Sequence, residues 1–239
     1  MNVKFKILGK ALIGLCLLVM VLDGGKIFLL SRGMDYSARP FERIRDNAAL
    51  KILFLGDSTA VGIGSATPQT SIAGWFSRDF PEASIENIGQ TGLRLAGLRK
   101  KLDLIQRNDY DIIILQIGAN DIMRLTSLTN IHRDLRFILE FVRKKTKQVV
   151  ILHSGDIGTA PMFIWPVSWI LSKRSYAVRR IYQKAVQDTG ALYVDLIDLS
   201  TDRVFTNDQS KYYASDRLHL SGDGYRVWYE AIRTCFKPP

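Results

Sequence analysis

The chain has 239 residues, of which 47% are hydrophobic and 23% charged, which is typical of one globular domain with a short appendage. Its two cysteines, Cys16 and Cys235, exclude a disulfide framework and provide no metal-ligand spacing. The net charge of +10 is compatible with an anionic membrane surface nearby or with solvated helix faces. No zinc-finger spacing or RNA-binding signature accompanies the charge, so we expect no nucleic acid partner.

The N-terminus predicts a membrane segment. Lys4, Lys6 and Lys10 precede an unbroken apolar stretch at residues 11–22. Residues 11–30, taken as one helix, reach the length of about 20 residues that spans a bilayer. Residues 1–30 therefore predict an uncleaved signal anchor, with the rest of the chain exported to a periplasmic or other extracytoplasmic space. A cleaved signal peptide and a secreted protein are the alternative, although no small-x-small cleavage site lies near residue 22.

Residues 31–47 are polar and irregular and predict a linker or an ordered entry segment, and residues 48–239 predict the folded domain. In this domain strands alternate with helices. The predicted strands are Leu50–Leu55, Ser84–Ile88, Asp111–Ile117, Val149–Leu152 and Ala191–Leu196. Helical periodicity covers Ile72–Asp79, Leu93–Gln106, Ile131–Lys145, Ser172–Asp188 and Gly222–Phe236. This alternation predicts an α/β fold, a three-layer α/β/α sandwich with a parallel sheet of about five strands in flavodoxin-like order.

Polar, glycine-containing turns follow the first three predicted strands, at the sheet edge where parallel sheets bind ligands. They are Gly56-Asp57-Ser58, Asn87-x-Gly89-x-x-Gly92 and Gly118-x-Asn120-Asp121, and Asp216-Arg217-Leu218-His219 precedes the last helix. Four such motifs in this order, over about residues 50–235, resemble the blocks of the SGNH/GDSL hydrolases. Leu220 departs from the pattern, because many members carry proline there.

The resemblance implies a serine hydrolase without cofactor or metal. Ser58 would be the nucleophile, His219 its base and Asp216 the carboxylate that orients the base, which suits a serine hydroxyl because it needs an adjacent base at neutral pH. The amides of Ser58 and Gly92 and the side chain of Asn120 would form the oxyanion hole, with Gly89 a rival to Gly92.

Other interpretations compete at single positions. Ser58 alone would more often be a helix N-cap, and His153, which ends a strand with Asp156 close behind, is the rival base or a residue lining the pocket. The apolar segment 161–171 could be a lid, an acyl-chain wall, a membrane contact or ordinary core, and we assign substrate binding to Phe163, Trp165 and Trp169.

The predicted reaction is hydrolysis of a carboxylic ester through an acyl-serine intermediate. A lipid, a lysophospholipid or another acyl ester is the expected substrate, with the membrane contacted through the N-terminal segment. The alternative is a deacetylase or acyltransferase that acts on an acetylated envelope polysaccharide. A non-catalytic binding protein on the same fold and a flavodoxin-like nucleotide binder are further alternatives, and the oligomeric state stays open.

Overall fold

The computed structural model describes residues 38–198 and 203–235, together with residues 10, 13–19, 21–22, 24–25 and 29 near the N-terminus. The predicted signal anchor or signal peptide at residues 1–30 therefore lies largely outside the described residues. Within the described part of the chain, no helix combines the length and the apolar character needed to cross a bilayer.

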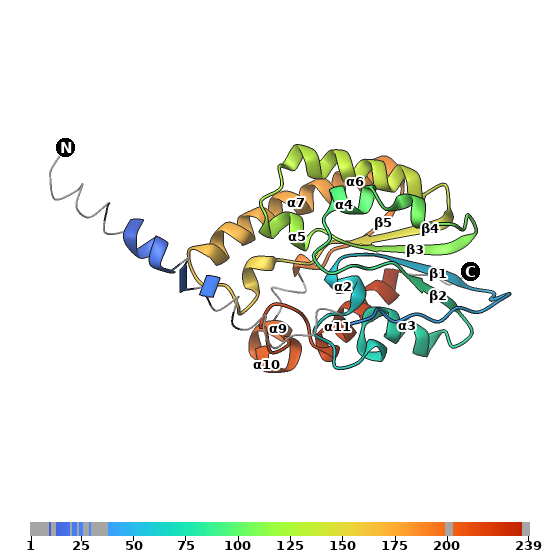
Figure 1. Ribbon diagram of the computed structural model, residues 1–239, viewed down its shortest axis with the longest axis horizontal. Helices are drawn as coiled ribbons and strands as arrows, with labels where there is room; N and C mark the ends of the chain where they lie inside the picture. The colour runs from blue at the N-terminus through green and yellow to red at the C-terminus, as the bar shows by residue number, and fades with distance from the viewer. Residues whose placement is uncertain are drawn as a thin grey trace.

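Five parallel strands form the single described sheet, in the order β2-β1-β3-β4-β5 (Figure 1). The strands are β1 (Lys51–Gly56), β2 (Ser84–Asn87), β3 (Tyr110–Gln116), β4 (Thr146–Leu152) and β5 (Leu192–Val194). This is the flavodoxin-like order. The predicted three-layer α/β fold with a five-stranded parallel sheet is confirmed.

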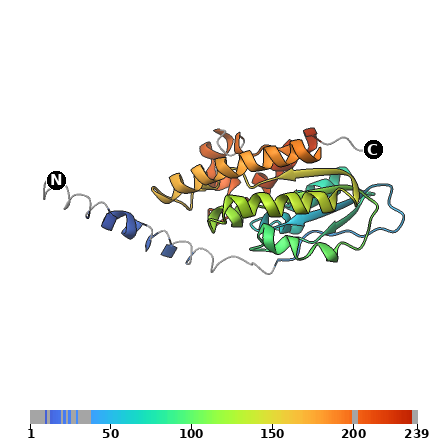
Figure 2. The same ribbon diagram turned by 90° about the horizontal axis from the view of Figure 1, so that it is seen from above.

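Helices cover both faces of the sheet, as Figures 1 and 2 show. One face carries α4 (Leu95–Arg99), α6 (Leu128–Val142) and α7 (Val167–Thr189), and the other carries α3 (Ile72–Asp79) and α11 (Gly222–Cys235). The shorter helices are α2 (Ser58–Val61), α5 (Ala119–Met123), α9 (Arg203–Asn207) and α10 (Gln209–Tyr212), and the 3-10 turns are η1 (Pro68–Thr70), η2 (Leu102–Leu104) and η3 (Ile157–Thr159).

The strands β1, β3 and β4 contribute alternate side chains to two hydrophobic cores. In β1, for example, Leu53 and Leu55 pack under α4, α6 and α7, whereas Ile52 and Phe54 pack under α3 and α11. All seven residues of β3 are buried. This two-sided burial explains why the strands read as continuous apolar runs in the sequence.

The predicted helix over Leu93–Gln106 is wrong as one element. Leu93, Leu95, Leu98 and Leu102 are buried, but the helix α4 ends at Arg99 and the 3-10 turn η2 follows. Gly97 weakens a helix at this point, and the amide of Lys101 bonds the carbonyl of Leu98 at 2.8 Å instead of continuing the α-helical pattern. The spacing of the apolar residues therefore predicted that this segment packs on the core. The chain does so with a short helix and a 3-10 turn instead of one long helix.

Two helices begin earlier than predicted. The helix α6 begins at Leu128 because the Ser127 side chain caps it by accepting a hydrogen bond from the Asn130 amide at 3.2 Å. The helix α7 begins at Val167, so part of the apolar segment 161–171 is helical.

Residues 38–47 lie along the outer edge of β2. Arg43 and Ile85 exchange two backbone hydrogen bonds of 2.8 and 2.7 Å. The Arg43 guanidinium also donates to the carbonyls of Ser77, Phe80 and Ala83. These contacts cover an edge strand that would otherwise leave backbone groups unpaired.

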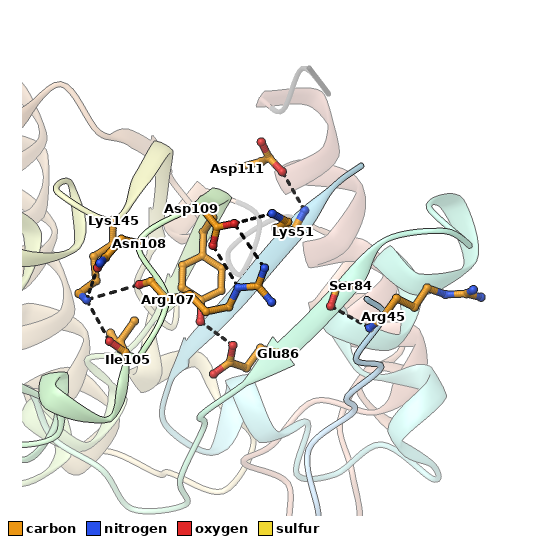
Figure 3. Close-up of polar contacts among 11 residues, drawn as sticks. Arg45, Lys51, Ser84, Glu86, Ile105, Arg107, Asn108, Asp109, Asp111 and Lys145 are labelled. Carbon is orange, nitrogen blue, oxygen red and sulfur yellow. Dashed lines mark hydrogen bonds and ion pairs between the residues drawn. The ribbon is translucent and has the colours of Figure 1, made fainter. Parts of the chain in front are cut away.

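The amino ends of the strands carry a network of charged side chains (Figure 3). Lys51 at the start of β1 pairs with Asp109, which also pairs with Arg107. The Asp111 carboxylate accepts a hydrogen bond of 2.9 Å from the Lys51 amide, and Lys145 donates to the Ile105 carbonyl at 2.9 Å. The charges of this edge are thus partnered within the protein.

Candidate active site

The turn after β1 places Ser58 at the carboxyl edge of the sheet. Gly56 lies against β3 so closely that a Cβ there would be 1.7 Å from the Gln116 carbonyl oxygen, so the turn requires glycine. Asp57 is fully buried, and its Oδ1 accepts hydrogen bonds from the amide and the hydroxyl of Thr59 at 3.0 and 2.9 Å. Asp57 therefore caps α2, and Ser58 is the first residue of that helix.

Ser58, His219 and Asp216 form one hydrogen-bonded chain. The Ser58 hydroxyl lies 2.9 Å from Nε2 of His219, and Nδ1 of the same ring lies 2.6 Å from Oδ2 of Asp216. The Asp216 side chain is fully buried, and that of His219 is 11% exposed. The structure thus brings the three predicted catalytic residues together, with the imidazole between a hydroxyl and a carboxylate.

The surroundings of Asp216 favour its charged form. Burial by itself raises the pKa of this carboxyl, but the hydrogen bond from His219 and the charge of its ring lower it more, together with the Leu218 and His219 amides. Both amides donate to Oδ1 at 3.0 Å, which leaves Oδ2 for the imidazole. The pKa of Asp216 consequently lies below its ordinary value, and the carboxylate holds the ring in one orientation.

A tight loop aligns His219 with Ser58. The Ala214 amide bonds the His219 carbonyl at 2.8 Å, and Arg217 adopts a left-handed φ of 60°. On the other side, a Cβ at Gly64 would be 2.4 Å from the Leu220 carbonyl oxygen and 2.9 Å from the His219 Cβ. Gly64 therefore lets the histidine loop pack directly against the segment that follows α2.

Two backbone amides near Ser58 have no hydrogen-bond partner among the described residues. In the first turn of α2, the Thr59 and Ala60 amides both bond Asp57, whereas the Ser58 amide bonds nothing. The Gly92 amide is also unpaired, and Gly92 has a left-handed φ of 77°. The Gly89 amide, in contrast, donates to the Asn87 side chain at 3.0 Å. Of the two glycines, Gly92 is thus the one with a donor to offer.

Asn120 follows β3 at the first turn of α5. It is 7% exposed, and its side chain makes no hydrogen bond with a described residue. The neighbouring Asp121 has a structural role, because its Oδ2 accepts a hydrogen bond of 2.9 Å from the Leu95 amide. Asp121 thereby ties the loop that contains Gly92 to the start of α5.

An apolar cavity of about 50 Å³ opens beside Ser58 and His219. Its walls come from five separate segments of the chain: Ser58 and Thr59, Ala119 and Met123, residues 154–160, Phe205 with Tyr213, and residues 218–220 with Trp228. The sequence did not identify Phe205, Tyr213 or Ala160 as lining residues, because they are distant in the chain and carry no motif. Trp228 belongs to α11, the helix that follows His219 in the chain.

The residues that we assigned to substrate binding lie elsewhere. Phe163, Trp165 and Trp169 do not line the cavity, and Trp165 and Trp169 are 59% and 58% exposed. Phe163 is partly buried against the hydrophobic core, whereas Trp165 lies just before α7 and Trp169 in its first turn. The cavity gives no support to their role in substrate binding, which stays a prediction.

His153 is also not in the cavity. It is fully buried against Tyr182 and Tyr193, and burial lowers its pKa from 6.5 to about 4. It forms no contact with Ser58, so the structure does not support it as a rival base or as a lining residue. Among the described residues, no group of His, Cys, Asp or Glu side chains could hold a metal ion.

A hydroxyl, an imidazole and a buried carboxylate in line, beside unpaired amides at the carboxyl edge of a parallel sheet, are typical of serine hydrolases. The chain belongs to the GDSL-like lipase/acylhydrolase family, whose model matches residues 54–227. None of the curated proteins compared with the chain matches it.

Solved structures share the fold. A lipolytic protein of the G-D-S-L family from Veillonella parvula is 18% identical and has a TM-score of 0.62, with 79% of this chain and 98% of that chain covered. An acetyl xylan esterase from Geobacillus stearothermophilus is 20% identical and has a TM-score of 0.60, with 78% and 94% covered. A lipase/acylhydrolase from Enterococcus faecalis is 21% identical and has a TM-score of 0.55, with 80% and 98% covered.

Proposed function

We propose that the chain hydrolyses carboxylic esters through an acyl intermediate on Ser58. The observation that carries the proposal is the chain of two hydrogen bonds, 2.9 Å from Ser58 to His219 and 2.6 Å from His219 to Asp216. In the first step His219 takes the hydroxyl proton while the Ser58 oxygen attacks the ester carbonyl carbon. His219 then gives the proton to the leaving alkoxide, and the alcohol departs.

In the second step water attacks the acyl-serine. His219 takes a proton from the water and returns it to the Ser58 oxygen as the carboxylic acid leaves. Each step passes through an oxyanion, for which the Ser58 and Gly92 amides and the Asn120 side chain are the available donors. Their lack of other partners supports this role, because preorganised donors need not break a bond before they stabilise the developing charge.

The cavity supports a short acyl group as the second candidate for the substrate. A single water needs roughly 10–15 Å³ of such space, so about 50 Å³ accommodates a few non-hydrogen atoms rather than a long acyl chain. An acetyl ester on a polysaccharide satisfies this limit, and acetyl xylan esterases are among the proteins with this fold. A lipid or lysophospholipid would need its chain to leave the cavity toward solvent.

We further propose that the N-terminal segment holds the chain at a membrane, with the hydrolase domain exported. The basic residues before the apolar stretch at 11–22 support this proposal. Protease protection of a C-terminally tagged chain in intact and permeabilised cells tests it. Cleavage of the domain only after permeabilisation of the inner membrane would contradict export.

A series of p-nitrophenyl esters from acetyl to decanoyl tests the reaction and the acyl preference together. We expect hydrolysis by the full chain in detergent, with kcat/KM highest for the short acyl groups, and none by Ser58→Ala. A kcat/KM that is highest for the decanoyl ester would reject the short-acyl substrate but would still support ester hydrolysis. No hydrolysis of any ester, with the same result for Ser58→Ala, would contradict the esterase itself.

A further inference from the structure

Four large apolar side chains project into solvent where α7 begins. Ile164, Trp165, Trp169 and Ile170 are 39%, 59%, 58% and 40% exposed, and we call them the α7 tip. Single exposed apolar residues are common on proteins, but a contiguous group with two tryptophans indicates a contact surface. Since the α7 tip does not line the cavity beside Ser58, its exposure needs another explanation.

The α7 tip is held in place by the structure beneath it. Leu171 and Met162, its neighbours in the chain, are 5% and 4% exposed and lie in the protein interior. A Cβ at Gly158 would be 2.1 Å from the Ser168 carbonyl oxygen, so η3 packs directly on α7. The Ser175 hydroxyl accepts a hydrogen bond of 3.1 Å from the Ile157 amide. The tip is therefore a fixed surface that cannot fold onto the protein to hide its tryptophans.

The exposed face of α7 continues from apolar to basic. Trp169, Lys173, Tyr176 and Arg180 are all exposed and follow each other at three- and four-residue spacing, so they lie on one side of the helix. Lys173 and Arg180 form no ion pair with a described residue. Residues 157–187 contain no Asp or Glu that could neutralise them. The tip thus borders a positive stripe.

We propose that the α7 tip inserts into the headgroup region of an anionic lipid bilayer. Tryptophan is favoured at this depth, and Lys and Arg behind it can reach the anionic headgroups. Figures 1 and 2 show that the start of α7 lies at the end of the molecule nearest the helical residues 13–19. Apolar side chains of that helix, such as Ile13 and Leu17, are 62% and 57% exposed.

This placement gives the enzyme a defined orientation. The segment that carries the α7 tip follows β4 at the same carboxyl edge as Ser58, and both Ile157 and Ala160 of that segment line the cavity. With the tip in the lipid headgroups, the carboxyl edge of the sheet lies close to the membrane surface and the amino edge points away.

Tryptophan quenching by brominated lipid tests the insertion. The full chain is reconstituted in vesicles of phosphatidylcholine and phosphatidylglycerol, with phosphatidylcholine carrying bromine on its acyl chains as the quencher. Two of the four tryptophans lie in the α7 tip, the other two are Trp75 and Trp228, and residues 1–74 contain none. Attachment by the N-terminus therefore gives no signal, and tip insertion removes up to about half of the emission.

Matched variants separate the explanations. Trp165→Phe/Trp169→Phe is expected to lose the quenching, and Ile164→Ser/Ile170→Ser, which keeps both tryptophans, to reduce it. A further variant adds Leu104→Trp to Trp165→Phe/Trp169→Phe. Leu104 is 52% exposed and lies just before β3, at the amino edge of the sheet, so we expect no quenching of a tryptophan there. Ser58→Ala is expected to be quenched like the wild type, so the result does not depend on the proposed hydrolysis.

Equal emission in brominated and ordinary vesicles, for chain that co-sediments with both, would overturn the proposal. Quenching of Leu104→Trp as strong as that of the tip would overturn it as well, because the chain would then lack a fixed orientation. Unquenched tip tryptophans together with crosslinking between copies at Trp169→Cys would assign the tip to a second copy of the chain instead.

Discussion

The two edges of the sheet differ in whether their polar groups are paired within the protein. At the amino edge, the charged side chains of Lys51, Arg107 and Asp109 are partnered with each other and remain in contact with solvent (Figure 3). At the carboxyl edge, the Ser58 and Gly92 amides and the Asn120 side chain have no partner among the described residues, although Ser58 and Asn120 are buried. Buried polar groups are normally paired, so those left open indicate where a ligand is to bind.

The fold alone does not distinguish the two edges of the sheet. Both consist of turns between the same strands and helices, and both carry polar residues. The edges differ in their hydrogen-bond donors. The Lys145 ammonium donates to the Ile105 carbonyl, whereas the Gly92 amide has no partner among the described residues. Substitutions at the two edges should therefore affect different measurements.

The largest effect is expected at the nucleophile and its base. Ser58→Ala and His219→Ala should each reduce kcat by a factor of about 10⁶, as in other serine triads whose members act as a unit. The double variant should be no worse than either single variant. Stopped assays with an activated ester check this result. Losses that multiply in the double variant would show that the two residues do not act together.

Asp216→Asn is expected to reduce kcat by about 10⁴, because the amide can hold the imidazole in the wrong tautomer. The Leu218 and His219 amides can still bond the remaining oxygen, so the loop should persist. Steady-state kinetics together with a thermal melt separate the two roles. A kcat within tenfold of the wild type would contradict the assignment of Asp216.

Asn120→Ala should lower kcat by about 10²–10³ without a comparable change in KM, since an oxyanion donor acts mainly in the transition state. Its side chain forms no hydrogen bond with a described residue, so stability should hardly change. Asp121→Ala is the matched comparison, because it removes the Leu95 hydrogen bond and should lower the melting temperature. A rise in KM alone for Asn120→Ala would place the residue in ground-state binding instead.

His153 makes the carboxyl edge sensitive to acid. Burial lowers its pKa from 6.5 to about 4, so between these pH values the unfolded chain binds a proton that the folded protein does not. The free energy of unfolding should therefore fall by about 3 kcal/mol as the pH decreases from 6.5 to 4. In His153→Phe this decrease in the free energy of unfolding should be absent. Urea melts at pH 7.5 and pH 4.5 measure it, and an unchanged pH dependence in the variant would contradict it.

The smallest effect is expected at the amino edge. Lys51→Met removes the ion pair with Asp109, but exposed ion pairs contribute little because water and salt screen them. We expect kcat and KM to stay as in the wild type and the melting temperature to decrease slightly at low salt. A loss of activity in this variant would end the distinction between the edges.

The sequence predicted those parts of the molecule that depend on local order. The continuous apolar runs of β1 and β3, separated by helical segments, predicted a buried parallel sheet. Turns such as Gly56-Asp57-Ser58 predicted polar groups where these strands end. The hydrogen bonds of Asn87 and Asp121, which fix the loops of the site, connect distant parts of the chain and leave no periodic pattern.

The cavity and the α7 tip illustrate the limit of sequence patterns. Phe205 and Trp228 meet beside Ser58 only because the chain returns to the carboxyl edge after β5. Trp165 and Trp169 looked like lining residues because they are apolar and follow a strand at the catalytic edge. Whether such a segment turns inward or outward depends on where α7 begins, and the apolar pattern did not predict that it starts at Val167.

Labelling with a fluorophosphonate directly tests whether Ser58 is an activated serine. The full chain in detergent is treated with the probe beside Ser58→Ala and His219→Ala, and the modified peptide is located by mass spectrometry. We expect a single label on Ser58 that is absent in both variants. A folded wild-type chain that takes no label, or a label on another serine that both variants retain, would contradict it.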